Sequence, residues 1–284
     1  MRSIQEVLSQ DSAILKATLG ITANEARLEV QMLLQQTLAV VRAYLLAHPE
    51  QMLSAAQQAA YAAMLQRRMH GEPIAYILGE REFFGLKFQV TQATLIPRPE
   101  SELLVELALQ HIPAHGHFRV LDLGTGSGAL AIAIAHSRAD AQVIAVDASE
   151  TALQVARSNA QRLGIANLHF RQSDWFSALA GQRYDLIVSN PPYIAADDEH
   201  LSRGDVRFEP ISALAAGADG LDDIRHIVAH AADFLERGAW LLLEHGYDQA
   251  ANVRDLLRQA GYTEVHSARD IAGIERVSCG RILP

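Results

Sequence analysis

The spacing of hydrophobic residues along the chain first indicates helices. In residues 21–47 apolar side chains recur every three or four positions, as in an amphipathic helix, and Thr22 or Asn24 can cap its start. Residues 54–71 carry the same spacing between a serine, a good N-cap, and a glycine, a common helix stop. We therefore expect residues 1–73 to form a small all-helical domain that serves packing or partner recognition.

The pattern then changes to aromatic and β-branched residues punctuated by glycine and proline. This texture continues through residues 74–102 and is typical of strands joined by tight turns. It predicts a β-hairpin that links two domains.

In residues 103–284 strand-like and helix-like segments alternate, which predicts an α/β domain with a parallel sheet covered by helices on both faces. Seven strands are expected, at residues 118–124, 142–147, 167–173, 185–190, 239–246, 263–268 and 275–283. One well-patterned helix is expected over residues 221–238, with Gly238 at its end.

Composition excludes several classes of protein. The chain has 284 residues, is 49% hydrophobic and contains one cysteine, Cys279, so an intramolecular disulfide is impossible. No Cys/His spacing resembles a zinc site, and no metal is expected. Its longest apolar runs are too short to span a membrane, and the first residues lack the layout of a signal peptide. A cytoplasmic monomer is the expectation.

The acidic charge argues against nucleic acid as a partner. The formal net charge is −9, and residues 101–284 contain 15 Lys and Arg against 24 Asp and Glu. Proteins that bind a phosphate backbone usually present a basic surface, because release of counterions supplies much of their affinity.

A glycine-rich turn carries the first sign of chemistry. Gly124, Gly126 and Gly128 follow a predicted strand and precede an apolar helix, where glycine lets a ligand approach backbone amides. Asp147 ends the next strand, where a carboxylate can accept both hydroxyls of a ribose. The arrangement also fits the dinucleotide pattern through Ala129, or a merely structural turn.

Three further features favour S-adenosylmethionine over NAD. Asp122, in the preceding strand, would repel a pyrophosphate but suits the cationic methionine end of a sulfonium cofactor. The order from Asp122 to Gly128 resembles the first motif of class I methyltransferases, a family that holds adenine where this chain has Asp174 and Trp175. The alternative for Trp175 is a plain core tryptophan. The expected cofactor-binding residues are Gly124, Thr125, Gly126, Ser127, Gly128, Asp147, Asp174, Trp175 and Asn190.

The run Asn190-Pro191-Pro192-Tyr193 follows the fourth predicted strand. An amide nitrogen is a poor nucleophile, so an enzyme must hold its hydrogens and aim its lone pair at the methyl group. The Asn190 side-chain oxygen and the Pro191 carbonyl can accept those hydrogens, and the prolines fix the backbone. Tyr193 can stack on the planar substrate group. These four are the expected catalytic residues; the alternative is an ordinary Asn-Pro turn.

Nearly the whole chain resembles the bacterial peptide chain release factor glutamine-N5 methyltransferases of HemK or PrmC type. The resemblance rests on "GEPIAYILGEREFFGLKFQVTQATLIPRPESE", "DLGTGSGALA", "NPPYI", "RGDVRFEP", "DGLDDIR" and "LLLEHG". The family usually has threonine in place of Ser101, which keeps the hydroxyl.

The resemblance implies a class I, Rossmann-like methyltransferase that uses S-adenosylmethionine and releases S-adenosylhomocysteine. It also implies that the helical domain helps to dock the release factor, while the catalytic domain receives the glutamine of its Gly-Gly-Gln loop. Arg98 and Glu100 could close the site or simply pin the hairpin.

Two other substrates remain open. A related glutamine methyltransferase modifies a ribosomal protein, and an N6-adenine DNA methyltransferase grips a flipped base with the same four residues. A non-enzymatic cofactor-binding scaffold is disfavoured, because it gives Asn190 and Tyr193 no task.

Overall fold

The computed structural model of the protein describes residues 1–283. The chain divides into two compact units, and the first combines residues 1–79 with the later segment 202–208. The helices of the first unit are α1 (Ile4–Leu19), α2 (Ala23–Leu38), α3 (Arg42–Ala47), α4 (Ala55–Met69) and α5 (Ile74–Leu78). The later segment contains the 3-10 turn η3 (Val206–Phe208), and the 3-10 turn η2 (Glu199–Ser202) ends at its first residue.

Side-chain caps define the helix starts in this unit. The side chains of Ser3, Thr22 and Ser54 each accept a hydrogen bond from the backbone amide three residues later. The Glu or Gln side chain at that later position accepts a hydrogen bond from the backbone amide of the cap residue. The caps predicted for the second and fourth helices are thus confirmed, with Thr22 rather than Asn24 in the role. The helices enclose an apolar core of their own.

The helix expected over residues 21–47 is interrupted, and this prediction was wrong in extent. Ala39 adopts a left-handed conformation with φ 53°, and the chain resumes as α3 after Val41. The two β-branched residues at this point, Val40 and Val41, favour helices less than the leucines before them.

A buried arginine ties residues 202–208 to the helices. The Arg68 guanidinium makes two hydrogen bonds with Glu29, at 2.7 and 3.0 Å, and a third with Asp205 at 2.8 Å. It also donates to the backbone oxygens of Gly71 and Glu72. A guanidinium that is only 3% exposed needs such partners, since an unpaired buried charge is strongly destabilising.

The second unit contains the hairpin and the large sheet. Strands β1 (Glu80–Phe83) and β2 (Leu86–Gln89) pair antiparallel. Phe84 and Gly85 both have positive φ in the turn between them, as a type I′ turn requires. The expected hairpin therefore covers residues 80–89, and the first residues of the predicted linker, 74–78, are helical instead.

The sheet has seven strands, as predicted, in the order β5-β4-β3-β6-β7-β9-β8. They are β3 (Phe118–Leu123), β4 (Ala141–Asp147), β5 (Leu168–Gln172), β6 (Tyr184–Ser189), β7 (Leu235–Glu244), β8 (Thr263–Arg269) and β9 (Glu275–Arg281). The first five are parallel, and β9 runs antiparallel to both of its neighbours.

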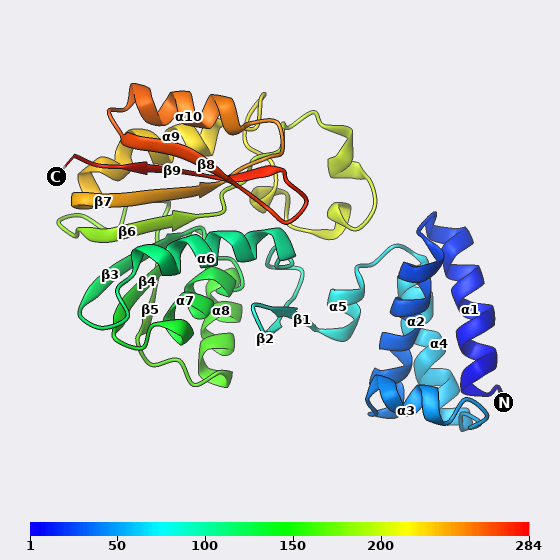
Figure 1. Ribbon diagram of the computed structural model, residues 1–284. Helices are drawn as coiled ribbons and strands as arrows, with labels where there is room; N and C mark the ends of the chain where they lie inside the picture. Colours follow the sequence, from blue (N-terminus) through cyan, green and yellow to red (C-terminus); the bar gives the residue numbers. More distant parts are fainter. Residues whose placement is uncertain (284) are drawn as a thin grey trace. The chain divides into compact units, whose positions relative to one another are not determined.

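Helices cover both faces of this sheet, as predicted (Figure 1). On one side lie α6 (Glu102–His111), α7 (Ala129–Ser137) and α8 (Glu150–Arg162), and on the other α9 (Asp222–Ala231) and α10 (Ala250–Gln259). Short 3-10 turns are η1 (Pro99–Ser101), η4 (Ile211–Ala213) and η5 (Ala232–Phe234). The two faces have separate apolar cores.

The helix expected over residues 221–238 is shorter than predicted. It ends at Ala231, and after a 3-10 turn the chain enters β7 at Leu235, so Gly238 lies within a strand and does not end the helix. Gly238 has φ 77°, and the pairing of β6 with β7 is irregular between Leu235 and Trp240. The glycine therefore marks an irregularity in the strand.

Candidate functional site

The site lies where the strand order reverses. The chain passes from β3 through β4 to β5, then returns to place β6 on the other side of β3. Leu123 and Ser189 end these neighbouring strands in register, and the Ser189 hydroxyl donates to the Leu123 carbonyl at 2.7 Å. Open α/β sheets bind ligands outside the carboxyl ends of strands at such a switch point.

Two cavities open at this edge, and Gly124 and Asp147 line both of them. The first, which we call the amide cavity, is lined by Phe83, Leu95, Pro97, Arg98, Ser101, Gly124, Thr125, Gly126, Ser127, Ala129, Leu130, Asp147, Asn190 and Ala213. The second, the tryptophan cavity, is lined by Gly124, Asp147, Ala148, Ser149, Ser173, Asp174, Trp175, Pro192, Ser212 and Asp223.

The glycine loop is held by its own acidic residues. Asp147 accepts hydrogen bonds from the backbone amides of Gly126 and Ser149, both at 2.8 Å. Burial raises the pKa of Asp147, and these two amides oppose the rise. The carboxylate retains lone pairs for further donors, because each oxygen accepts more than one hydrogen bond.

Gly128 shows why this loop needs glycine. Its φ is 84°, and a β-carbon there would lie 2.9 Å from the Ile132 side chain and 3.1 Å from that of Ala156. The residue directly precedes α7, so the close packing of α7 on α8 depends on the missing side chain.

Asp122 does not take the place expected for it. It is fully buried, lines neither cavity, and accepts a hydrogen bond from the Thr125 hydroxyl at 2.6 Å. Burial raises its pKa to about 7. The structure therefore places Asp122 beneath the loop, where its Oδ1 has no hydrogen-bond partner among residues 1–283. Its role toward a cationic ligand group stays a prediction.

The Trp175 ring lies over the loop. A β-carbon on Gly124 would be 3.6 Å from the ring, which is half-buried. Trp175 has φ 44°, an uncommon conformation for a bulky residue. Its neighbour Asp174 is exposed and lines the same cavity.

Asn190 carries an unsatisfied acceptor. Its side-chain nitrogen donates to the Ser101 hydroxyl at 3.2 Å, while its buried Oδ1 has no hydrogen-bond partner among residues 1–283. Such an atom is costly to bury unless a ligand supplies a donor. This orphaned oxygen, in the wall of the amide cavity, marks where an N–H group is expected.

The backbone after Asn190 is fixed from several sides. The amides of Tyr193 and Ile194 donate to the Leu214 carbonyl, and the Gln249 side chain donates to the Tyr193 carbonyl at 2.9 Å. Pro191 is buried, Pro192 reaches the tryptophan cavity, and Tyr193 packs partly against the core. The structure thus brings Asn190 and Asp147 into one cavity, while Pro191 and Tyr193 line neither.

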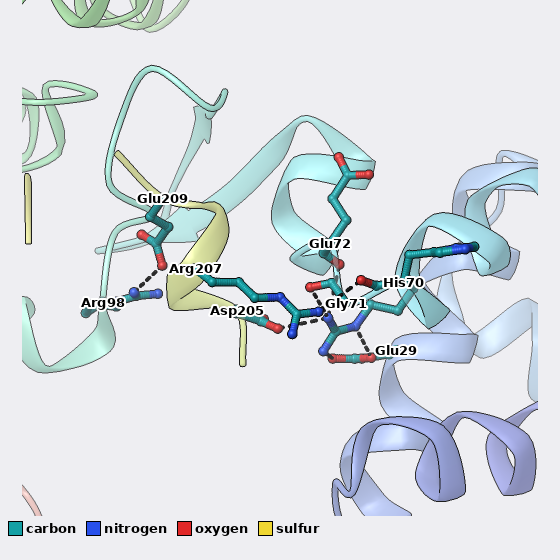
Figure 2. Close-up of polar contacts among 9 residues, drawn as sticks. Glu29, His70, Gly71, Glu72, Arg98, Asp205, Arg207 and Glu209 are labelled. Carbon is teal, nitrogen blue, oxygen red and sulfur yellow. Dashed lines mark hydrogen bonds and ion pairs between the residues drawn. The ribbon is translucent and has the colours of Figure 1, made fainter. Parts of the chain in front are cut away.

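Arg98 and Glu100 do not pair with each other in the way that a pinned hairpin would suggest. Arg98 lines the amide cavity and forms an ion pair with the buried Glu209 (Figure 2). Glu209 also accepts a hydrogen bond from the Ile96 amide at 2.9 Å. The segment before α6 is therefore tied to the segment that precedes η4.

Similarity to known proteins agrees with this geometry. Residues 114–229 match the family model of a methyltransferase domain, and residues 6–79 match that of the PrmC N-terminal domain. The release factor glutamine methyltransferase of Salmonella typhimurium is 50% identical over 262 residues, which cover 92% of this chain and 94% of that protein. This chain belongs to the release factor glutamine methyltransferases.

Other relatives support the same membership. The release factor glutamine methyltransferase of Bordetella pertussis is 52% identical over 89% of this chain and 94% of its own length. A methyltransferase structure from Pyrococcus furiosus aligns with a TM-score of 0.54 at 19% identity, over 78% of this chain and all of that one. The latter shows a shared fold, and with it the class I methyltransferase architecture is confirmed.

Two polar residues near Asn190 were not predicted as site residues from the sequence. Ser101 holds the Asn190 nitrogen, and Glu244, at the carboxyl end of β7, lies 3.5 Å from the Tyr193 hydroxyl. The strand-end rule that selected Asn190 applies equally to Glu244, but it needs the knowledge that β7 is the neighbour of β6. Among residues 1–283 no cluster of side chains could hold a metal ion, and no helix is long and apolar enough to cross a membrane.

Proposed function

We propose that the protein transfers a methyl group from S-adenosylmethionine to the side-chain nitrogen of the glutamine in the Gly-Gly-Gln loop of peptide chain release factors. The observation that carries this proposal is the buried, unpaired Oδ1 of Asn190 at the strand switch point. This oxygen can accept a hydrogen bond from an N–H group, and a carboxamide supplies such a group. The close relatives named above as release factor glutamine methyltransferases support the choice of substrate.

The residues at the glycine loop fit the cofactor. Asp147 would accept the ribose hydroxyls, Trp175 in the wall of the tryptophan cavity would contact the adenine, and the backbone of Gly124, Thr125, Gly126, Ser127 and Gly128 would line the rest, with Asp174 at the rim. When bound, S-adenosylmethionine supplies an electrophilic methyl group on a sulfonium and leaves as S-adenosylhomocysteine.

The residues after β6 would orient the substrate. Asn190 Oδ1 accepts one hydrogen of the glutamine NH2 group, and the Pro191 carbonyl accepts the other, which turns the nitrogen lone pair toward the methyl group. Positive charge that develops on this nitrogen is stabilised by the two oxygens. Pro191 and Pro192 fix φ, and Tyr193 supports the loop through its packing.

The helical unit is the proposed recognition module for the release factor. It has its own core, and residues 6–79 match a domain that is named for this enzyme class. The acidic charge of residues 101–284 disfavours DNA as the substrate, so N6-adenine methylation is the weaker alternative.

Incubation with radiolabelled S-adenosylmethionine tests the proposal. Purified release factor should take up label, and a release factor whose loop glutamine is replaced by asparagine should not, although it keeps a carboxamide. A large-subunit ribosomal protein mixture and double-stranded DNA serve as competing substrates. Label that persists on the release factor variant, or that appears only on a competitor, contradicts the assignment.

A further inference from the structure

The orientation of the Asn190 amide is not fixed by Ser101 alone. The Asn190 nitrogen donates to the Ser101 hydroxyl oxygen at 3.2 Å, and Oδ1 faces no other partner among the described residues. A hydroxyl can donate as well as accept, so Ser101 could equally hold the amide turned by half a rotation. In that orientation an NH2 group, and no acceptor, would face the cavity. A third group must therefore decide the direction of the hydrogen bonds.

Glu244 lies where it can fix the direction of these hydrogen bonds. This carboxyl is 2% exposed, and its Oε1 lies 3.5 Å from the Tyr193 hydroxyl. Oε2 is buried and makes no hydrogen bond of ordinary length within residues 1–283. Burial raises the pKa of this carboxyl, and the Ser101 hydroxyl lowers it as a hydrogen-bond donor. Glu244 has no part in the binding contacts assigned above.

We propose that Glu244 is a positioning residue that acts through Ser101 to hold the Asn190 amide with Oδ1 toward the substrate. A carboxylate can only accept, so the Ser101 proton is directed to Glu244. The Ser101 lone pairs are then left to accept from the Asn190 nitrogen, and Oδ1 is turned to the cavity. This inference deepens the proposed function and rests on it.

A protonated Glu244 reverses the chain of bonds. The carboxylic acid donates to Ser101, Ser101 can donate to Oδ1, and the amide turns its NH2 group toward the substrate. Burial is the largest influence and raises the pKa of Glu244 to about 7. Arg276 on β9, Ser101 and the Tyr193 hydroxyl lower the pKa, and Glu100 in η1 raises it. Methyl transfer should therefore weaken as the pH falls below about 7.

The first experiment compares the pH dependence of kcat in the wild type and in Glu244→Gln, with release factor as substrate. The wild type should gain activity as the pH rises through about 7. Glu244→Gln should lack this rise, with kcat about 10- to 100-fold lower on the alkaline side and an unchanged Kd for S-adenosylmethionine. A variant profile that retains the wild-type rise overturns the inference.

Ser101 variants keep the test valid if Glu244→Gln folds poorly. Ser101→Ala breaks the chain of bonds and should lower kcat by a similar factor, whereas Ser101→Thr restores the hydroxyl and should recover kcat. Equal kcat values for wild type and Ser101→Ala contradict the inference. Wild-type protein that methylates no release factor at any pH contradicts the proposed function instead.

Glu100→Gln supplies a readout that a merely structural role would leave unmoved. Loss of this neighbouring negative charge lowers the pKa of Glu244, so the rise in kcat should move to lower pH. The same midpoint should appear without turnover in the ¹³C chemical shift of the Glu244 carboxyl, assigned by its absence in Glu244→Gln. The inference is overturned if the pH midpoint is the same in Glu100→Gln as in the wild type, or if the midpoints from kcat and from NMR differ.

Discussion

The two sides of the amide cavity differ in whether the oxygens of their polar side chain, Asp147 or Asn190, already have hydrogen-bond partners. On the glycine-loop side the two oxygens of Asp147 each accept a backbone amide. On the other side Asn190 keeps Oδ1 buried and unpaired among the described residues. Asp147 is therefore held in place before any ligand arrives, whereas the Asn190 oxygen is paired only by a donor from outside. Binding and reaction should therefore separate in variants of the two sides.

The largest effect is expected at Asn190. Asn190→Ala removes the acceptor that we propose acts where charge develops, so kcat should fall by about 10³-fold or more. The Kd for S-adenosylmethionine, measured by calorimetry, should stay nearly unchanged, because the glycine loop is intact. Parallel loss of cofactor binding would show that the two sides are not separate.

Asn167→Ala is the matched control for this variant. Its side chain donates to the carbonyls of Ala135, Arg138 and Ala141, away from both cavities. Its loss should lower the melting temperature and leave kcat close to that of the wild type below the transition. Equal losses of kcat at positions 190 and 167 would mean that general destabilisation explains both.

The next largest effect is expected at Gly128, through stability. An alanine there combines a left-handed φ with contacts of 2.9 and 3.1 Å, which should lower the free energy of unfolding by about 2–4 kcal/mol. Gly181 has a φ of 74° and open space around it, so Gly181→Ala should cost only about 1 kcal/mol. Urea denaturation measures both. Similar values for the two variants would remove the argument that α7 packs through this glycine.

A smaller effect is expected at Asp147. Asp147→Asn replaces one acceptor oxygen by a donor group that opposes the Gly126 or Ser149 amide, and it removes a charged acceptor for the ribose. The Kd for S-adenosylmethionine should rise about 10- to 100-fold, with kcat at saturation mostly retained. The exposed Asp140, before the same strand, offers the control, and Asp140→Asn should leave Kd unchanged. A drop in kcat with unchanged Kd would contradict the separation of cofactor binding at Asp147 from the reaction at Asn190.

The sequence predicts the sheet better than the ends of its helices. All seven predicted strands overlap strands of the sheet. Three of them, β3, β6 and β7, read as nearly continuous hydrophobic segments because they are buried parallel strands. The end of α9 was wrong, since Phe234 and Leu235 suit either a helix face or a buried strand. The spacing alone does not show where the chain leaves one structure for the other.

The site was predictable only where a single strand end reveals it. Asp147 ends β4, whereas Trp175 and Asn190 follow β5 and β6, and the structure brings all three to two adjoining cavities. The burial of Asp122 beneath the loop was not evident from the sequence, because the strand pattern does not show that the Thr125 hydroxyl donates to it. Predicting Glu244 requires the order of the strands in the sheet, which arises from the fold and not from the local sequence pattern.

The smallest effect is expected at Tyr193. Its hydroxyl is 3.5 Å from Glu244, a long contact, and the ring packs against the core of the α9 and α10 face. Burial also raises the pKa of the phenol, so it stays protonated at neutral pH and donates. Tyr193→Phe keeps the ring and should lower kcat less than tenfold at alkaline pH, when Glu244 is already charged.

Tyr193→Ala separates the ring from the hydroxyl. Loss of the ring should lower kcat/KM more than Tyr193→Phe does, because the loop that carries Asn190 loses its support. Steady-state kinetics of both variants, read beside Asn190→Ala, rank the contributions on this side of the site. If Tyr193→Phe lost as much activity as Asn190→Ala, the hydroxyl itself would act on the substrate, and the unpaired amide oxygen would no longer distinguish the two sides.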